Sequence, residues 1–384
     1  MIYFKSDNIV SPLGFSTKET TDLVLVGETG IKEIFDKDLY PEPFPASMID
    51  EEKLETEFIK VATRYSSTKK FTKLEKMLII SVDDALSATD VDITSKRTAI
   101  ILSTTKGNID LLGNVYDYDK DRVSLWKLGE VIASFFSNPN TPVVISNACI
   151  SGVLAINTAA MLIDSQQYDD VVVTGGDIVS RFVVSGFMSF LSLSTKPCKP
   201  FDANRDGLSL GEAAATIIMG NKPGNISPSL VFAGGSSAND ANHISGPSRT
   251  GEGSYIAIQK AMDEAKINAK MIDHISAHGT ATPYNDEMES IAIDRHGMTH
   301  VPVNSIKGNL GHTLGAAGIV ESAILLEEMK RNILIDTTGY IEHGVSKPIA
   351  VIKESAKKEL VNCLKMASGF GGSNAAMIIS KIVE

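Results

Sequence analysis

Cysteine, tryptophan and positive charge are all scarce in this sequence of 384 residues. It contains one tryptophan and three cysteines, Cys149, Cys198 and Cys363, which are too few and too scattered for a disulfide framework or a zinc cluster. A reducing compartment is the simpler interpretation. The 36 lysines and arginines stand against 47 aspartates and glutamates, which gives a net charge of −11. This balance argues against a general nucleic-acid-binding protein, because such a protein needs a dominant basic face.

A signal peptide and a membrane span are not expected either. The first residues, Met1 to Asp7, lack the basic and then apolar layout of a signal peptide. The range 143–163 carries no charge, but polar residues such as Asn147 and Asn157 interrupt it. We interpret it as a buried strand that runs into a buried helix. We therefore expect a cytoplasmic protein with no membrane partner.

Hydrophobic residues make up 43% of the chain, enough for a large core in one big domain or two ordinary ones. Short β-branched runs alternate with helical stretches, which predicts an α/β fold with a mostly parallel sheet covered on both faces. The expected strands are Thr98–Leu102, Pro142–Ile145, Val171–Thr174, His274–Ala277 and Val301–Asn304. The expected helices are Leu74–Ala88, Val153–Ile163, Tyr255–Ala265 and Glu287–Asp294.

The two halves of the chain share one pattern. Thr141-Pro-Val-Val-Ile-Ser-Asn and Val301-Pro-Val-Asn-Ser-Ile-Lys are both strands that start at a proline and lead through a turn into a helix of small residues. A duplicated α/β unit, with the two helices packed through Gly and Ala faces, explains this better than chance. The seam is expected at 221–228, which divides the chain into 1–222 and 223–384.

Cys149 lies in Asn147-Ala-Cys-Ile-Ser-Gly, between an expected strand and an expected helix. Such an elbow lifts a side chain out of the sheet toward a helix N-terminus, where the helix dipole and free N–H groups favour a nucleophilic thiolate. A buried structural cysteine is the alternative, and both interpretations stay open on local pattern alone. Cys198 and Cys363 lack such a setting and are interpreted as structural.

Two histidines follow expected strands in Gly-rich loops: His278 in Ser276-Ala-His-Gly-Thr and His312 in Lys307-Gly-Asn-Leu-Gly-His. The carboxyl ends of parallel strands are where α/β proteins hold reactive groups, although a single such histidine is more often a turn residue. Ser368-Gly-Phe-Gly-Gly-Ser-Asn is either an ordinary tight turn or a backbone N–H donor beside a mobile aromatic.

Two metal-binding interpretations fail on spacing. Asp202-Ala-Asn-Arg-Asp-Gly imitates the start of a calcium loop, but its twelfth position is Ala213, and Glu212 comes one residue early. His274 and His278 are four residues apart, but Ile275 and the residues before it indicate a strand, and no glutamate stands between the two histidines. We expect no functional metal.

Taken together, the motifs resemble the elongating β-ketoacyl-acyl carrier protein synthases of the thiolase-like superfamily. Two related families are disfavoured here: the initiating synthases, which carry a Cys-His-Asn arrangement, and the thiolases, which use a second cysteine in a Cys-Gly motif. The opening Val10-Ser-Pro-Leu-Gly also looks like the family's start. The matches that follow in family order are Asn147-Ala-Cys-Ile-Ser-Gly, Lys199-Pro-Phe-Asp-Ala-Asn-Arg-Asp-Gly with Leu210-Gly-Glu-Ala, Ala277-His-Gly-Thr-Ala-Thr, Lys307-Gly-Asn-Leu-Gly-His-Thr-Leu-Gly-Ala-Ala-Gly and Gly369-Phe-Gly-Gly-Ser-Asn.

The resemblance implies a thiolase-like fold. This fold has two duplicated α/β halves, whose mixed, mostly parallel five-stranded sheets pack around buried helices in αβαβα layers. It also implies a decarboxylative Claisen condensation that elongates fatty-acid, polyketide or polyene chains carried on phosphopantetheine, without a cofactor. The alternatives are a non-catalytic chain-length factor, which would have lost the nucleophile, and a thiolase, which would need a second cysteine and coenzyme A.

The resemblance assigns the catalytic roles. Cys149 accepts the acyl chain, which splits the condensation into two easier steps. Neutral His278 and His312 each donate an Nε2–H to the thioester oxygen as malonyl decarboxylation makes it negative. Lys307 orients the two histidines.

Further residues support these roles by the same resemblance. The backbone N–H groups of Cys149 and Phe370 hold the oxyanion, and Phe370 is the gate. Glu321 and Asp286 support the network. Family members usually carry an aromatic residue where Ser368 stands, so the gate is expected to move differently here. The range 104–137 matches no motif, so chain-length preference cannot be read from the sequence.

The implied partners are an acyl carrier protein and either a second copy of the chain or a related subunit, such as a chain-length factor. Acyl carrier proteins are acidic, so a local basic cluster must overcome the net charge of −11. A solvated helix face is the plainer interpretation of a lysine run. The expected docking residues are Lys69, Lys70, Lys73, Lys76, Lys199 and Arg205.

Overall fold

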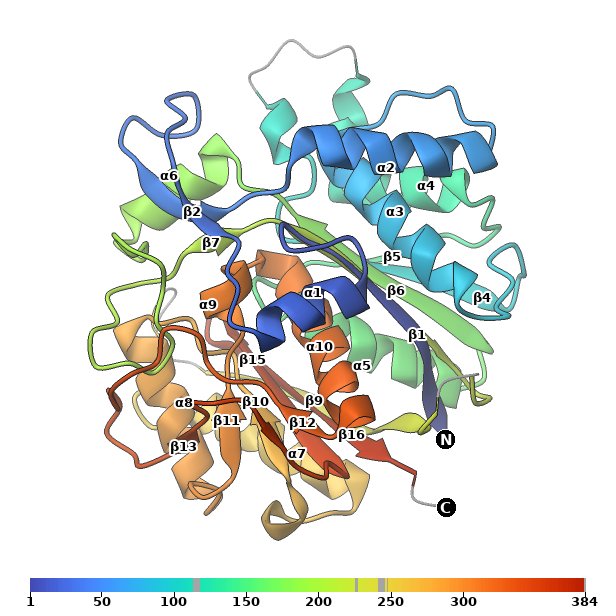
Figure 1. Cartoon of the computed structure of the whole chain (residues 1–384). Coiled ribbons are helices and arrows are strands. Elements are labelled where there is room, and N and C mark those ends of the chain that lie inside the picture. Colours follow the sequence, from blue (N-terminus) through green and yellow to red (C-terminus); the bar gives the residue numbers. More distant parts are fainter. Residues whose placement is uncertain (113–117, 225–226, 241–245, 247, 383–384) are drawn as a thin grey trace.

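The computed structural model of the chain describes residues 1–112, 118–224, 227–240, 246 and 248–382. Helices and strands alternate along it, as Figure 1 shows. The strands are β1 (Ile2–Val10), β2 (Ile31–Ile34), β3 (Phe44–Ser47), β4 (Thr98–Ser103), β5 (Val143–Ile145), β6 (Asp170–Asp177), β7 (Leu210–Gly211), β8 (Ala213–Gly220), β9 (Leu230–Asn239), β10 (His274–Ser276), β11 (Pro302–Asn304), β12 (Ile333–Leu334), β13 (Ala350–Val351), β14 (Ala356–Lys357), β15 (Asn362–Gly369) and β16 (Ser373–Lys381). The α-helices are α1 (Thr17–Leu25), α2 (Glu51–Arg64), α3 (Lys73–Ser87), α4 (Leu125–Phe135), α5 (Ser151–Asp164), α6 (Arg181–Ser189), α7 (Glu252–Ala265), α8 (Pro283–Arg295), α9 (Lys307–Leu310) and α10 (Ala317–Arg331).

The strand order shows the duplication. The first half contributes β5-β4-β6-β8-β1 and the second half β11-β10-β15-β16-β9, so each half uses its strands in the order third, second, fourth, fifth, first. The pairing matches too: β4 is parallel to β5 and β6, and β10 is parallel to β11 and β15, while the remaining pairs are antiparallel. The expected α/β fold with two mixed five-stranded units is confirmed.

The two five-stranded units are joined. β1 and β9 pair antiparallel through Ile2 with Phe232 and Tyr3 with Val231, and β13 adds one more strand beside β11. One sheet of 11 strands therefore runs through the described residues, instead of two separate sheets. Smaller sheets are formed by β12 with β14 and by β2, β3 and β7.

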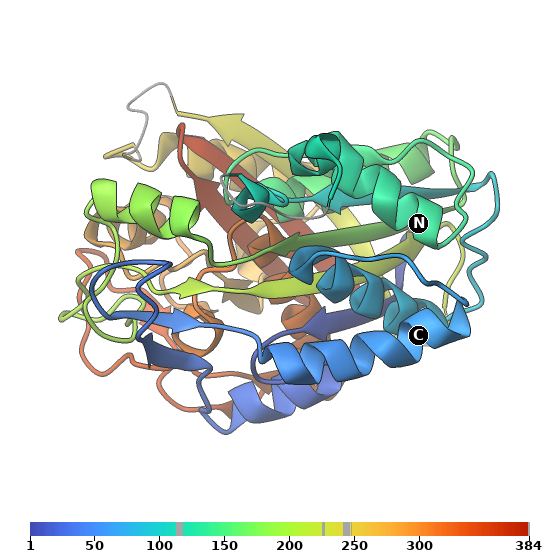
Figure 2. The same ribbon diagram turned by 90° about the horizontal axis from the view of Figure 1, so that it is seen from above.

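The chain forms five layers: helices, one half of the sheet, central helices, the other half of the sheet and outer helices. Three large hydrophobic cores lie between these layers. The central core surrounds α5 and α10, with Ile156 and Ile324 between the two halves of the sheet. A second core packs α3 and its neighbours α2 and α4 on the outer face of the first half, and a third packs α7 and α8 on the second half. Figure 1 places α5 and α10 in the middle, and Figure 2 shows the blue α2 and α3 and the teal α4 over one outer face.

The two central helices touch through glycine, as the repeated small-residue pattern predicts. A Cβ added at Gly152 of α5 would lie 2.7 Å from the backbone nitrogen of Ile319 and 2.9 Å from the Cα of Gly318. A Cβ at Gly318 of α10 would in turn collide with the backbone nitrogen of Val153. Because backbone stands on both sides, the two halves can approach this closely only without side chains.

Gly318→Ala is expected to destabilise the fold, by about 3 kcal/mol, the upper end of typical overpacking costs. This loss exceeds the roughly 1 kcal/mol that alanine gains over glycine in a helix. Urea unfolding measures the difference. Gly186→Ala in α6 is the matched control, since its added Cβ meets no atom within 4 Å and should stabilise slightly. Equal stability of the two variants would contradict the close contact.

The expected strands and helices all fall on observed ones. The division at residue 222 stays a prediction, and Asn225 and Ile226 of the expected seam lie outside the described residues. Among the helices of the described ranges, none combines the length and apolar character that crossing a membrane requires.

Candidate active site

Cys149 lies on the turn between β5 and α5. Ala148 adopts a left-handed backbone with φ of 43°, which is uncommon for a residue with a side chain. The Ser151 hydroxyl fixes this turn, because it donates to the Ala148 carbonyl at 2.6 Å and accepts the Asn147 N–H at 2.8 Å. The strained turn presents Cys149 to a cavity.

This cavity has a volume of about 440 Å³. Cys149, His278 and His312 line it, so side chains from three segments far apart in the sequence meet there. Phe187, Phe190 and Phe370 also line it. The cavity therefore combines a reactive group with an apolar wall.

His278 is held at the end of β10 by its backbone and by its ring. The Glu289 carboxylate on α8 accepts the N–H groups of His278 and Gly279, each at 2.7 Å. The Lys307 ammonium lies 3.2 Å from His278 Nδ1 and donates to the His278 carbonyl at 2.5 Å. Both the position and the rotation of the imidazole are fixed in this way.

His312 reaches Cys149 because the preceding residue is glycine. Gly311 has φ of 69°, and a Cβ there would lie 2.5 Å from the Leu210 carbonyl oxygen. The His312 N–H donates to the Ser209 carbonyl at 2.7 Å, which ties this loop to β7. As a result, His312 Nε2 lies 2.9 Å from Cys149 Sγ.

The neighbours of both histidines define the tautomer. The Lys307 ammonium can only donate, so His278 Nδ1 accepts and the ring proton is on Nε2. The Leu314 N–H donates to His312 Nδ1 at 3.4 Å, with the same consequence. Burial, with Lys307 as the next cause, lowers the pKa of His278 and His312 well below 6.5. Both rings are therefore neutral Nε2–H donors near neutral pH.

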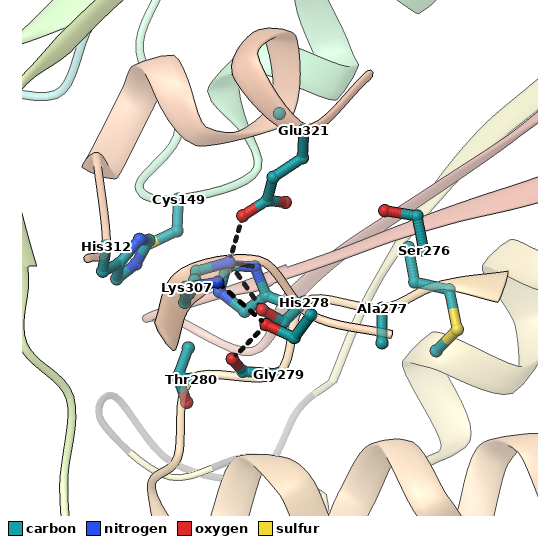
Figure 3. Close-up of polar contacts among 12 residues, drawn as sticks. Cys149, Ser276, Ala277, His278, Gly279, Thr280, Lys307, His312 and Glu321 are labelled. Carbon is teal, nitrogen blue, oxygen red and sulfur yellow. Dashed lines mark hydrogen bonds and ion pairs between the residues drawn. The ribbon is translucent and has the colours of Figure 1, made fainter. Parts of the chain in front are cut away.

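Lys307 is buried, with only 1% of its surface exposed, and is the centre of this network. Its ammonium forms an ion pair with Glu321 of α10, and Figure 3 shows it between Glu321 and His278. A buried ammonium is stable only when it is paired and hydrogen-bonded, so Glu321 keeps Lys307 charged beside the histidine.

The local pattern favours a thiolate at Cys149, but the surroundings of the residue in the fold oppose one. Burial raises the pKa of Cys149 to about 12, and the nearby Lys307 ammonium, which lowers it, is too weak to compensate. The buried Asp177 carboxyl raises this pKa further. Desolvation therefore outweighs the helix N-terminus on which the expectation relied, and Cys149 rests as a neutral thiol.

Phe370 packs against two aromatic rings, Phe187 in α6 and Phe190 directly after this helix. Its ring centroid is 5.7 Å from that of Phe187, in a stacked arrangement, and 5.2 Å from that of Phe190. Ser368 is buried, and its hydroxyl bonds to Asn374 at 2.9 Å. A polar contact thus occupies the place where the family usually has an aromatic, while the aromatic packing on Phe370 comes from another segment.

The comparison with known families agrees with this geometry. Residues 7–223 match the family described as "Beta-ketoacyl synthase, N-terminal domain", and residues 230–340 match "Beta-ketoacyl synthase, C-terminal domain". The chain belongs to the beta-ketoacyl synthase family.

Curated relatives carry the same family identity. The chain is 32% identical over 263 residues to a putative mitochondrial 3-oxoacyl-[acyl-carrier-protein] synthase of Schizosaccharomyces pombe, covering 62% of this chain and 61% of the relative. It is 26% identical to 3-oxoacyl-[acyl-carrier-protein] synthase 2 of Vibrio harveyi, covering 98% and 97%. The chain thus spans about three fifths of the first relative and nearly all of the second.

Solved structures of ketosynthases share the fold. A ketosynthase of Xenorhabdus doucetiae, solved in complex with its chain length factor, is 25% identical with a TM-score of 0.85, covering 99% of this chain and 98% of that chain. A beta-ketoacyl synthase of Burkholderia phymatum is 23% identical with a TM-score of 0.88, covering 100% and 99%. The thiolase-like fold class is confirmed.

Other family motifs brace the loop that carries His278. The Asp286 carboxylate accepts the N–H groups of Phe201 and Thr280, which ties the Lys199 motif to the histidine loop. Asp202, the first residue of the calcium-like pattern, accepts the N–H groups of Ile341 and Glu342. The aspartates of both segments therefore clamp backbone.

Two of the expected docking residues are used inside the protein. Lys73 pairs with the buried Glu212 at 2.8 Å, and the Arg205 side chain is 9% exposed, next to Asp286. Lys76 pairs with Glu55. Lys73 and Arg205 are therefore withdrawn as docking residues, because their charges already have internal partners. Lys69 and Lys70 are exposed, and Lys199 is half-buried.

Sequence reasoning missed Glu289, Asp177 and Lys365. Glu289 stands one helical turn after Asp286, a spacing that could have indicated it. Burial raises its pKa to about 7. Asp177 accepts the N–H groups of Thr105 and Gly315, a contact no local pattern signals. Lys365 is the lone charge in an otherwise uncharged strand.

The ligand atoms of Cys149, His278 and His312 lie within 4.8 Å of one another, a spacing that could hold a metal ion. Metal-binding histidines commonly donate Nδ1–H to a carboxylate or carbonyl. Here His278 Nδ1 faces the Lys307 ammonium instead, which repels a cation. The donor set therefore fits a metal poorly.

Proposed function

We propose that this chain is an elongating β-ketoacyl-acyl carrier protein synthase that catalyses decarboxylative Claisen condensation. The observation that carries the proposal is the convergence of Cys149 with two neutral histidines in one cavity. This set retains the nucleophile that a chain-length factor lacks. It offers no second cysteine as a thiolase requires, because Cys198 and Cys363 do not line the cavity.

Acyl transfer is the first half-reaction. The Cys149 sulfur attacks the thioester carbonyl of the acyl carrier protein, the bond from acyl carbon to pantetheine sulfur breaks, and the thiol proton passes to the departing thiolate. His312 Nε2–H, 2.9 Å from Sγ, donates to the sulfur as negative charge develops on it. Because burial raises the pKa of Cys149 to about 12, this donor assists acyl loading, although the step depends on it less than decarboxylation does.

Decarboxylation and condensation follow. The malonyl thioester loses carbon dioxide, and the electron pair moves to the thioester oxygen, which accepts Nε2–H from His278 and His312. The carbanion then attacks the acyl carbonyl, and Cys149 leaves as thiolate and takes a proton from solvent. The Cys149 and Phe370 N–H groups hold the intermediate oxyanion. Every step uses groups of the chain and its substrates, so we propose no metal or organic cofactor.

The test is incubation of the purified chain with a panel of acyl- and malonyl-carrier proteins. Intact-protein mass spectrometry should show an acyl adduct on the chain. The carrier should then gain a 3-oxoacyl group two carbons longer, with one carbon dioxide released per condensation. Acylation by acyl-coenzyme A but by no carrier protein would contradict the proposal and favour a thiolase.

We also propose a cytoplasmic dimer, formed with a second copy or with a related subunit. The Xenorhabdus doucetiae ketosynthase, which pairs with a chain length factor, supports the second form. Native mass spectrometry of the chain alone separates them, because a homodimer needs no other gene product.

Carrier docking is proposed at Lys69, Lys70 and Lys199. Lys69→Glu with Lys199→Glu should raise KM for the carrier by about tenfold at low salt, through lost electrostatic steering. Turnover on a short pantetheine thioester should not change. The effect should fade as salt rises, because exposed charges beyond about 8–10 Å are screened. Lys260→Glu on α7 is the control, and an equal KM for both variants would remove the docking role.

A further inference from the structure

Lys365 is a buried cation that the proposed mechanism does not use. It lies in β15, fully buried, and its strand neighbours Leu364 and Met366 are apolar. Its ammonium donates to the carbonyl oxygens of Ser276 at 3.2 Å, Ala277 at 3.1 Å and Met366 at 2.8 Å. A fourth oxygen, Glu321 Oε2, lies 2.7 Å away.

These contacts identify the charged form. Carbonyl and carboxylate oxygens have no hydrogen to donate, so a neutral amine would turn its lone pair toward an oxygen. An ammonium instead gives its three N–H donors to the three carbonyl oxygens, and its charge pairs with the Glu321 carboxylate. Burial lowers the pKa of Lys365, while the Glu321 carboxylate counteracts this shift. The cage is therefore built for a cation.

Two of the caged carbonyls belong to Ser276 and Ala277, the residues directly before His278. The carboxylate in the cage belongs to Glu321, whose other oxygen pairs with Lys307. Lys365 thus contacts both supports of His278: the strand end that carries the histidine and the acid that pairs with Lys307.

We propose that Lys365 is a positioning residue for decarboxylation, a tethered internal cation that holds the β10 end and shares Glu321 with Lys307. This inference rests on the proposed function. Lys307 and Lys365 share the single carboxylate of Glu321, so loss of Lys365 removes one positive charge from this cluster.

The charge also acts on His278. The groups that face Lys365 are Glu321 on α10, Lys307 on α9, Glu289 on α8 and His278 itself. Burial is the main cause that lowers the pKa of His278, and Lys365 adds to it, so removal of Lys365 raises that pKa. The neutral ring is the active form. As the pH falls, the variant should therefore lose decarboxylation at a higher pH than the wild type does.

Lys365→Met keeps the length of the side chain and removes the ammonium. Decarboxylation of malonyl-carrier protein should fall by about tenfold, the effect of one pKa unit on a single group, with its acid limb moved to higher pH. Acylation of Cys149, measured by intact mass, should change far less. Lys381→Met, at the far end of the β15–β16 hairpin, is the control for loss of one positive charge. The inference is wrong if Lys365→Met matches an active wild type in rate and pH profile. If the wild type itself forms no acyl adduct, the proposed function is wrong, and the inference falls with it.

A second variant guards against a simple packing defect or a failure to fold. Lys365→Ala removes a three-carbon stem and an ammonium, which is the shape of propylammonium. Refolding with propylammonium should restore decarboxylation, whereas propanol, of the same size without charge, should not. Equal rescue by both compounds would reduce Lys365 to a space-filling role and overturn the proposal.

Discussion

Cys149→Ala is expected to abolish both the acyl adduct and the condensation. Cys149 Sγ is the group that His312 Nε2 contacts at the base of the cavity, and an alanine there cannot form a thioester. The fold should survive, because the change removes one buried atom. Intact mass spectrometry after incubation with acyl-carrier protein measures the adduct, and circular dichroism checks the fold.

The matched control for this variant is Cys363→Ser, a change at a buried cysteine of β15 outside the cavity. Cys363 does not line the cavity, so its thiol is not a competing nucleophile there. The Cys363→Ser variant should form the acyl adduct as the wild type does. An acyl adduct of normal yield on the Cys149→Ala protein would show that the nucleophile is another residue.

His278→Ala and His312→Ala are each expected to lower malonyl decarboxylation by about 10²–10³, the usual cost of one oxyanion donor. Acyl loading of Cys149 should be reduced much less, because the enolate does not form in that step. The exposed His300 offers the control, since His300→Ala removes an imidazole from outside the cavity. Carbon dioxide release from malonyl-carrier protein, with acyl loading measured in parallel, separates the two steps.

The pH dependence gives a second measurement of the same donors. Burial lowers the pKa of both rings well below 6.5, and the active form is neutral. Decarboxylation should therefore persist below pH 6.5 and fall only when the pH passes through the lowered pKa. An acid limb at an ordinary histidine pKa would contradict the buried, neutral donors, as would wild-type decarboxylation by either alanine variant.

Much of the site was within reach of the sequence. The strand-to-turn placement of Cys149, His278 and His312 follows from β-branched runs that end in Gly-rich loops, and parallel strands bring their carboxyl ends to one edge. The Gly-rich helices predicted the contact between the two halves, because small residues in repeated positions indicate close backbone approach. The family motifs named Lys307 and Glu321, and the structure places them in one ion pair.

Other features depended on burial and long-range contact. The net charge of −11 and the lysine run could not indicate that Lys73 and Arg205 would be paired internally, because partners such as Glu212 and Gly344 are more than a hundred residues away. The resting state of Cys149 is likewise a property of its surroundings. Helix position alone predicted a thiolate, whereas desolvation in the folded protein makes it a thiol.

By itself, the sequence determined the alternation of strands and helices, the repeated half and the identity of the reactive residues, since these depend on local periodicity and on residue type. Only the tertiary structure decided the tautomers of the two histidines, the charge state of Cys149 and the cage around Lys365. Each of these depends on which donors and acceptors lie within about 3 Å in a region without water, where an unpaired charge is costly. Such neighbours come from segments that the fold alone brings together.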